Sequence, residues 1–180
     1  MIYVFLAKGF EEIEAITPID LLRRCELDVV TVGIGGKNIE GAHGITVQTD
    51  IQDDELILSD DIKMIVLPGG MPGTLNLEHS PVVQSAVDFC IDNNKYIAAI
   101  CAAPSILGNK GLLKGKKATC FPGFEATLKE AIVTDECLCV DGNIITAKGP
   151  GAAIDFSLEL AALLTSYDRS NILKGSLQCL

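Results

Sequence analysis

A cysteine at the end of an apolar run is the residue best placed to do chemistry in this sequence. The segment Tyr96 to Ile100 has the composition of a buried strand, and Cys101 follows it directly, before Ala102, Ala103 and a helical segment. This order predicts that Cys101 lies on a sharp strand-to-helix turn at the carboxyl edge of a sheet. Because a helix N-terminus carries partial positive charge and free N–H groups, it would favour a nucleophilic thiolate there. The alternative is that Cys101 is a small buried apolar residue, as most free cysteines are.

A glycine-rich turn could supply hydrogen-bond donors to the same edge. Leu67-Pro68-Gly69-Gly70 follows another buried run. Glycines can turn backbone N–H groups toward a neighbouring strand end, so this turn could form an oxyanion hole. A purely structural turn is the alternative.

Three glutamates begin the first predicted helix, directly after the first apolar run. Acidic residues in a first turn usually complement the helix dipole, and this is the expected role of Glu11 and Glu12. Glu14 lies beside Ile13 and Ile16, where partial burial would raise the pKa of its carboxyl. A neutral Glu14 could donate a proton or a hydrogen bond to a thiolate.

Short apolar runs alternate with helical segments along the chain. Strands are predicted for Ile2 to Ala7, Val29 to Gly33, Met64 to Leu67 and Tyr96 to Ile100, with helices over Ile13 to Cys25, after Ser80-Pro81 and from Gly149-Pro150-Gly151 onward. Hairpins are expected at a sheet edge within residues 35–50 and around Asp141-Gly142. The pattern predicts an α/β fold with a doubly wound, mostly parallel sheet covered by helices on both faces. A single domain over residues 1–180 is expected.

Composition and charge exclude several classes of function. The chain has 180 residues, 48% of them hydrophobic, and 14 basic against 24 acidic residues give a formal charge of −10. Such a charge disfavours partners such as nucleic acids and anionic membranes. The apolar runs are far shorter than the roughly 20 residues that cross a bilayer. Since no cationic stretch precedes the first run, we expect a cytoplasmic protein without a secretory signal.

The remaining motifs indicate neither a bound cofactor nor a metal. Seven cysteines form no disulfide framework or paired zinc motif, so reduced thiols are expected. Cys137 and Cys139 would share one face of a strand, but no second ligand pair is visible and core packing is the expected explanation. Glycine-rich nucleotide motifs are absent, so no nucleotide cofactor is expected.

Taken together, these segments resemble the ThiJ/PfpI superfamily, and within it the branch of the Parkinson-disease protein deglycase and its bacterial relatives. The resemblance runs nearly end to end and is carried by Leu6 to Glu14, Pro18 to Asp20, Arg23-Arg24, Val66 to Gly70, Ala98 to Pro104 and Gly149 to Gly151. It implies a flavodoxin-like fold and a homodimer. By position, it implies that Cys101 is the nucleophile and that Glu14 is a protonated carboxyl bonded to its sulfur. It also implies that the N–H groups of Gly70 and Ala102 are oxyanion donors.

Two positions depart from the pattern of these relatives. Protease-like and amidotransferase-like members have a histidine immediately after the nucleophile, whereas this chain has Ala102, which disfavours peptidase chemistry. Some deglycase members have a pocket histidine just before a proline, where this chain has Phe121, and a phenyl ring cannot shuttle protons. His43 falls in the first hairpin, near the place of an arginine in relatives, although a solvated loop histidine is the expected explanation. Cys120 is a candidate resolving thiol for Cys101.

Two functions follow from the resemblance. The first is a cofactor-independent cysteine enzyme acting on α-oxoaldehydes such as methylglyoxal, or on their adducts with amines and thiols. Besides the catalytic residues, its possible pocket comprises Gly69, Phe121, His43 and Glu11. The second is a redox-sensing or chaperone-like stress protein in which Cys101 is oxidised to sulfinate.

Overall fold

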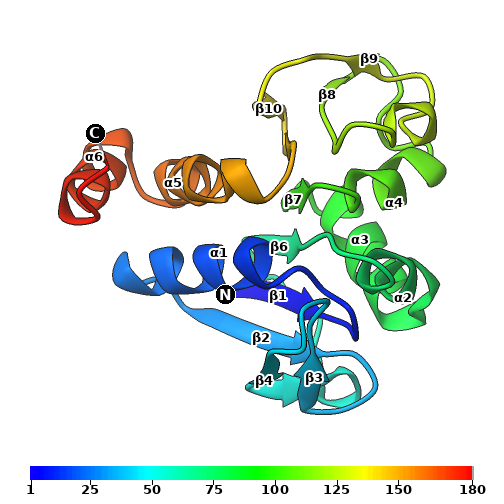
Figure 1. The fold of residues 1–180 in the computed structure, drawn as a ribbon, viewed down its shortest axis with the longest axis horizontal. Coiled ribbons are helices and arrows are strands. Elements are labelled where there is room, and N and C mark those ends of the chain that lie inside the picture. Colours follow the sequence, from blue (N-terminus) through cyan, green and yellow to red (C-terminus); the bar gives the residue numbers. More distant parts are fainter. Residues whose placement is uncertain (180) are drawn as a thin grey trace.

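The computed structural model describes residues 1–179, and its centre is a seven-stranded sheet (Figure 1). The strand order is β10-β11-β7-β6-β1-β2-β5. These strands are β1 (Ile2–Leu6), β2 (Val29–Gly33), β5 (Ile51–Gln52), β6 (Met64–Leu67), β7 (Tyr96–Ile100), β10 (Leu138–Asp141) and β11 (Ile144–Ala147). Neighbouring strands are parallel except β10, which is antiparallel to β11. The predicted doubly wound α/β fold is therefore confirmed.

Helices cover both faces of this sheet. They are α1 (Glu12–Arg24), α2 (Gly73–His79), α3 (Pro81–Asp92), α4 (Pro104–Asn109), α5 (Ala153–Leu164) and α6 (Tyr167–Ser176). Figure 1 shows α1, α5 and α6 on one side of the central strands and α2, α3 and α4 on the other. Side chains of a strand alternate between the faces, so Val4 packs in one core with α1 and α5 whereas Phe5 packs in the other with α3. None of the helices within residues 1–179 has the length and apolar character to span a membrane.

The direction of winding reverses between β1 and β6. From β1 the chain moves outward to β2 on one side, whereas β6, β7 and β11 follow on the other. In open α/β sheets this reversal leaves a crevice at the carboxyl ends of the strands, where ligands bind. The turns after β1, β6 and β7 therefore meet at one place, and they carry the residues singled out above.

The first predicted hairpin forms, but it does not join the edge of the main sheet. β3 (Asn38–Glu40) and β4 (Thr46–Gln48) pair only with each other, and β5 occupies the edge beside β2. The hairpin instead folds over the start of α1, where Gly9 N–H donates to Glu40 O at 2.8 Å and Ala42 N–H donates to Phe10 O at 2.7 Å. A second small sheet pairs β8 (Lys117–Ala118) with β9 (Ile132–Val133).

Two other expectations are corrected. The α-helix after Gly149 begins only at Ala153, because residues Pro150–Ala152 form a tighter 3-10 turn first. Cys137 and Cys139 do not share a buried strand face, since β10 begins at Leu138 and leaves Cys137 exposed while Cys139 is buried.

The first turns of α1 bury acidic residues and expose apolar ones, whereas Ile19, Leu21 and Leu22 further along the helix are buried. Ile13 is 54% exposed and Ile16 is 40% exposed, whereas Glu12 and Glu14 point inward and are buried. A helix normally buries its apolar residues and exposes its charged ones. Buried glutamates therefore need hydrogen-bond partners within the protein, and exposed isoleucines on one helix mark a candidate contact surface. Pro18 lies inside the helix.

Candidate active site

Cys101 lies on the turn that the sequence predicted, between the end of β7 and the start of α4. Its φ is +66°, a left-handed conformation that is costly for a non-glycine residue and clusters at functional sites. The conformation is held from both sides, because Cys101 N–H donates to Ala147 O and Cys101 O accepts from Phe121 N–H, both at 2.8 Å. Cys101 is only 9% exposed, so most of the residue is shielded from solvent.

The donors that reach the sulfur come from two turns rather than from a helix. α4 begins at Pro104 and is six residues long, so the expected influence of a helix N-terminus on Cys101 is small. Backbone N–H groups of Ala102 and Gly70 hydrogen-bond to the Cys101 sulfur and lower the pKa of its thiol. These are the two donors that the family resemblance implies, and the structure brings them together around one atom.

Glu14 reaches the same sulfur from α1 and is fully buried. Its Oε2 accepts a hydrogen bond from Gly69 N–H at 2.9 Å, and its Oε1 has no hydrogen-bond partner among residues 1–179. The pKa of Glu14 is raised from its ordinary value of 4.5 to about 7, because burial and the charge of Glu11 raise it more than the hydrogen bonds from Cys101 and Gly69 lower it. Near neutral pH this carboxyl can therefore hold or release a proton, as the sequence predicted.

The ionisation of the Cys101 thiol is coupled to that of the Glu14 carboxyl. Burial, together with the charge and hydrogen bond of Glu14, raises the pKa of the Cys101 thiol to about 12, against the lowering effect of the Ala102 and Gly70 N–H groups. The thiolate that the sequence predicted is therefore not stable beside an ionised Glu14. It becomes favourable when the thiol proton moves to Glu14, because the carboxyl then carries no charge and can donate a hydrogen bond to the sulfur.

Two glycines allow this close approach. A Cβ on Gly69 would lie 2.6 Å from both Cys101 Cβ and Glu14 Oε2, and a Cβ on Gly70 would meet Gly9 O at 2.6 Å and collide with Glu11 N. Gly70 also has a φ of +89°, which other residues adopt at a cost.

We expect Gly70→Ala to lower the free energy of unfolding by about 2 kcal/mol or more, because both the added Cβ and the backbone conformation are unfavourable. Urea denaturation would measure this. Gly175→Ala is the matched control, since Gly175 lies in α6 with nothing within 4 Å of its Cβ position, and it should be neutral or stabilising by up to about 1 kcal/mol. Equal effects of the two substitutions on the free energy of unfolding would show that the turn at Gly70 accommodates a Cβ at little cost.

Phe121 lies beside the site, at the place where some relatives have a histidine. The phenyl ring is on the surface, with Phe121 43% exposed, and its Cδ2 is 3.1 Å from where a Cβ of Gly149 would be. Glu14 Oε1 is 3.9 Å from the same point. A phenyl ring offers this oxygen no hydrogen bond, which agrees with its lack of a partner.

Glu11 and Glu12 have different roles. Glu11 caps α1, as expected, because its Oε2 accepts from Glu14 N–H at 2.8 Å. Glu12, by contrast, is buried and holds the β3–β4 connection: its Oε1 accepts from His43 N–H at 2.7 Å and its Oε2 lies 2.8 Å from His43 Nδ1. This role of Glu12 was not predicted from the sequence. The only signal for it was a histidine in the first predicted hairpin.

His43 is exposed, as predicted, but it is paired rather than free. Its hydrogen bond and charge interaction with Glu12 raise the pKa of the imidazole. Burial raises the pKa of Glu12, but the bonds from His43 and Ile45 outweigh it and the net direction is down. Ligand atoms of Glu11, Glu12 and His43 lie within 4.8 Å of one another, a spacing that could suit a metal ion, although the carboxylates already serve the helix cap and the loop.

The other cysteines have no evident role in the chemistry. All seven are free thiols. Cys120 is buried, and burial together with the charge of Glu125 raises the pKa of its thiol to about 11, against a lowering effect of Lys148. A resolving role for Cys120 stays a prediction from the sequence.

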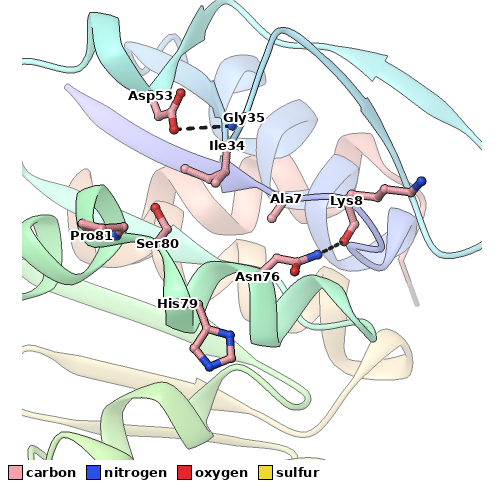
Figure 2. A pocket seen from close by; sticks show the side chains of 9 residues that line it. All are labelled: Ala7, Lys8, Ile34, Gly35, Asp53, Asn76, His79, Ser80 and Pro81. Atoms are coloured by element: carbon pink, nitrogen blue, oxygen red, sulfur yellow. Dashed lines mark hydrogen bonds between the residues drawn. The ribbon is translucent and has the colours of Figure 1, made fainter.

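A hollow of about 420 Å³ lies at the carboxyl edge of the sheet, but neither Cys101 nor Glu14 lines it (Figure 2). Asp53, His79 and Ser80 line it, the residue types of a hydrolase triad. Figure 2 shows the His79 ring extending away from both Ser80 and Asp53. Asp53 instead accepts from Gly35 N–H at 3.4 Å and Ser80 Oγ caps α3, so no triad is formed.

Comparisons with known proteins show the family of this chain. A model of the DJ-1/PfpI family matches residues 1–163. The chain belongs to the DJ-1/PfpI family. Among its family relatives, protein dj-1beta of Drosophila melanogaster is 34% identical over 97% of this chain and 95% of that protein. A deglycase of Thermococcus kodakarensis is 31% identical over 91% of this chain and 98% of that protein.

Solved structures of DJ-1 proteins share the fold over nearly the whole chain. The crystal structure of Drosophila melanogaster DJ-1beta matches with a TM-score of 0.93 and 31% identity over 99% of this chain and 97% of that one. Oxidised Toxoplasma gondii DJ-1 matches with a TM-score of 0.90 and 31% identity over 98% and 97%. The resemblance to the ThiJ/PfpI superfamily and the flavodoxin-like fold are thereby confirmed.

Proposed function

We propose that this DJ-1/PfpI protein is a cofactor-independent cysteine enzyme that converts α-oxoaldehydes such as methylglyoxal, or their early adducts with amines and thiols, into 2-hydroxy acids. The observation that carries the proposal is the buried Cys101–Glu14 pair, with the N–H groups of Gly70 and Ala102 aimed at the sulfur. The similarity to a protein named as a deglycase supports this class of reaction.

The pair can perform the first step without another group. The proton of Cys101 moves to Glu14, and the thiolate then forms a bond to the aldehyde carbon while the C=O electron pair moves to oxygen. Glu14 returns its proton to that oxygen, which gives a hemithioacetal. Because the oxygen develops next to the sulfur, the N–H groups of Gly70 and Ala102 are within reach to stabilise it.

The remaining steps need only proton transfers and water. Glu14, now ionised, takes the proton of the aldehyde carbon and delivers it to the neighbouring ketone carbon, while the hydroxyl proton on the first carbon passes to the ketone oxygen. The first carbon is thereby oxidised and the second is reduced. The product is a thioester of Cys101 with a 2-hydroxy acid. Water cleaves it, and the sum is one oxoaldehyde plus one water giving one hydroxy acid. The test is release of D- or L-lactate from methylglyoxal without glutathione, above the rate of a protein blank.

A redox-sensing role is the second candidate, and the relative solved in an oxidised form favours it. In that reaction the Cys101 thiolate takes two oxygen atoms from two peroxide molecules, releasing two waters and leaving a sulfinate. The donors of Gly70, Ala102 and a protonated Glu14 would then bind sulfinate oxygens. Mass spectrometry after mild peroxide treatment, beside the lactate assay, separates the two roles.

We also propose that the protein is a homodimer, assembled through the exposed isoleucines of α1 and α5. Ile13, Ile16 and Ile154 are apolar and exposed on two helices that pack on each other. We expect sedimentation to give a dimer mass, and Ile16→Asp to shift it toward the monomer because a charge in such a contact is costly. A monomeric wild type would contradict this. A single domain and a cytoplasmic location stay predictions from the sequence.

A further inference from the structure

A small apolar hollow opens beside the reactive cysteine. It has a volume of about 220 Å³ and lies between the turn after β8 and the turn before α5. The residues that line it are Phe121, Pro122, Cys137, Lys148, Gly149, Pro150, Gly151 and Ala152. Most of these are apolar or lack a polar side chain, so the hollow suits a hydrocarbon group rather than a polar one.

Two residues that line the hollow, Phe121 and Gly149, are also neighbours of Cys101 and Glu14. Phe121 N–H donates to the carbonyl oxygen of Cys101 at 2.8 Å, which ties this wall to the nucleophile. The Cβ position of Gly149 lies within 4 Å of both the Phe121 ring and Glu14 Oε1. A group bound in the hollow would therefore lie next to the carboxyl that moves protons.

The charge at the rim is already paired. Among the lining residues Lys148 is the charged one, and its Nζ donates to Asp135 O at 2.7 Å and lies 3.7 Å from Asp135 Oδ1. This arrangement directs the ammonium group to Asp135, so it does not make the hollow a strong anion site.

We infer that this hollow receives the substituent of the oxoaldehyde, and that the protein prefers α-oxoaldehydes with a ring-sized apolar substituent, such as an arylglyoxal, over methylglyoxal. This inference rests on the proposed function and names its substrate class. The volume is sufficient, because an apolar cavity of about 150 Å³ holds a benzene molecule. The exposed phenyl ring of Phe121 supplies the apolar wall, and the ring of the substrate would pack against it.

Phenylglyoxal tests the inference, since one phenylglyoxal and one water give one mandelate by the same internal transfer between neighbouring carbons. The quantity to measure is kcat/KM for phenylglyoxal divided by kcat/KM for methylglyoxal, because the intrinsic reactivity of the aldehydes then cancels between variants. We expect this ratio to fall about tenfold in Phe121→Ala, the size of effect seen for small changes in apolar pockets. Phe121→Leu should retain most of the preference. Ile172→Ala, which removes an exposed apolar side chain on α6, is the control and should leave the ratio unchanged.

Binding of the two hydroxy acids keeps the tests of substrate class and of activity separate. Ligand-observed NMR would compare mandelate with lactate on wild type and Phe121→Ala. If the protein turns over the aldehydes and Phe121→Ala leaves the ratio of the two kcat/KM values unchanged, the inferred substrate class is wrong and the proposed function still stands. Absence of turnover, with mandelate binding more tightly than lactate and weakened about tenfold by Phe121→Ala, overturns the proposed function and supports the apolar site. Absence of both turnover and mandelate binding overturns both.

Discussion

Cys101→Ser is expected to reduce lactate release from methylglyoxal to the level of a protein blank, a loss of at least about a thousandfold. Serine keeps the size of the side chain and its place on the turn, but its hydroxyl ionises far less readily than a thiol and Glu14 alone cannot activate it. The measurement is D- and L-lactate formation without glutathione. The thermal unfolding midpoint of the variant should stay near that of wild type, which separates lost chemistry from lost structure.

Cys179→Ser is the matched control, because Cys179 is a free, partly exposed thiol near the end of the chain. It should retain the wild-type rate. A Cys101→Ser variant that turns over methylglyoxal as fast as wild type would refute nucleophilic catalysis by this residue. If wild type itself gives no lactate while mild peroxide converts Cys101 cleanly to sulfinate, the redox-sensing role is the correct one.

Glu14→Gln is expected to make the protein more stable at pH 8 but not at pH 4.5. The folded state holds the Glu14 proton up to a pKa of about 7, whereas the ordinary value is 4.5. Between these two pH values the folded protein binds more protons than the unfolded chain, so the stability of wild type falls as pH rises. The difference between the two pKa values corresponds to about 3 kcal/mol in the free energy of unfolding, which wild type loses as the pH rises. Glutamine does not ionise, so the variant does not have this loss. Urea denaturation from pH 4.5 to pH 8 measures this change.

Glu40→Gln is the control for that experiment, because Glu40 is exposed on β3 and its substitution should leave the wild-type pH dependence intact. Curves for wild type and Glu14→Gln that stay parallel from pH 4.5 to pH 8 would mean that folding does not raise the pKa of Glu14. The same Glu14→Gln variant should lose most lactate release at neutral pH, because glutamine cannot accept the proton of Cys101. Stability gained together with activity lost is the expected mark of a buried catalytic carboxyl.

Much of the fold could be predicted from local pattern. Short apolar runs, each followed closely by a glycine or a cysteine, identify the strands. The order of strands and helices along the chain restricts the sheet to a doubly wound form. The position of Cys101 on a turn and the closeness of the Gly69-Gly70 turn follow from that order, since carboxyl ends of parallel strands meet at one edge. The place of the β3–β4 hairpin could not be predicted in this way, because its contacts are with the start of α1, about thirty residues earlier.

The sequence by itself therefore determined the sheet, the edge at which the site lies and the residue types that can react there. Only the tertiary structure decided that α1 turns Glu12 and Glu14 inward and leaves Ile13 and Ile16 outside, that Glu12 holds His43, and that Phe121 and Gly149 border an apolar hollow. The physical reason is that strand and helix patterns depend on neighbours along the chain. Burial, proton affinity and the shape of a cavity depend instead on atoms that only folding brings together.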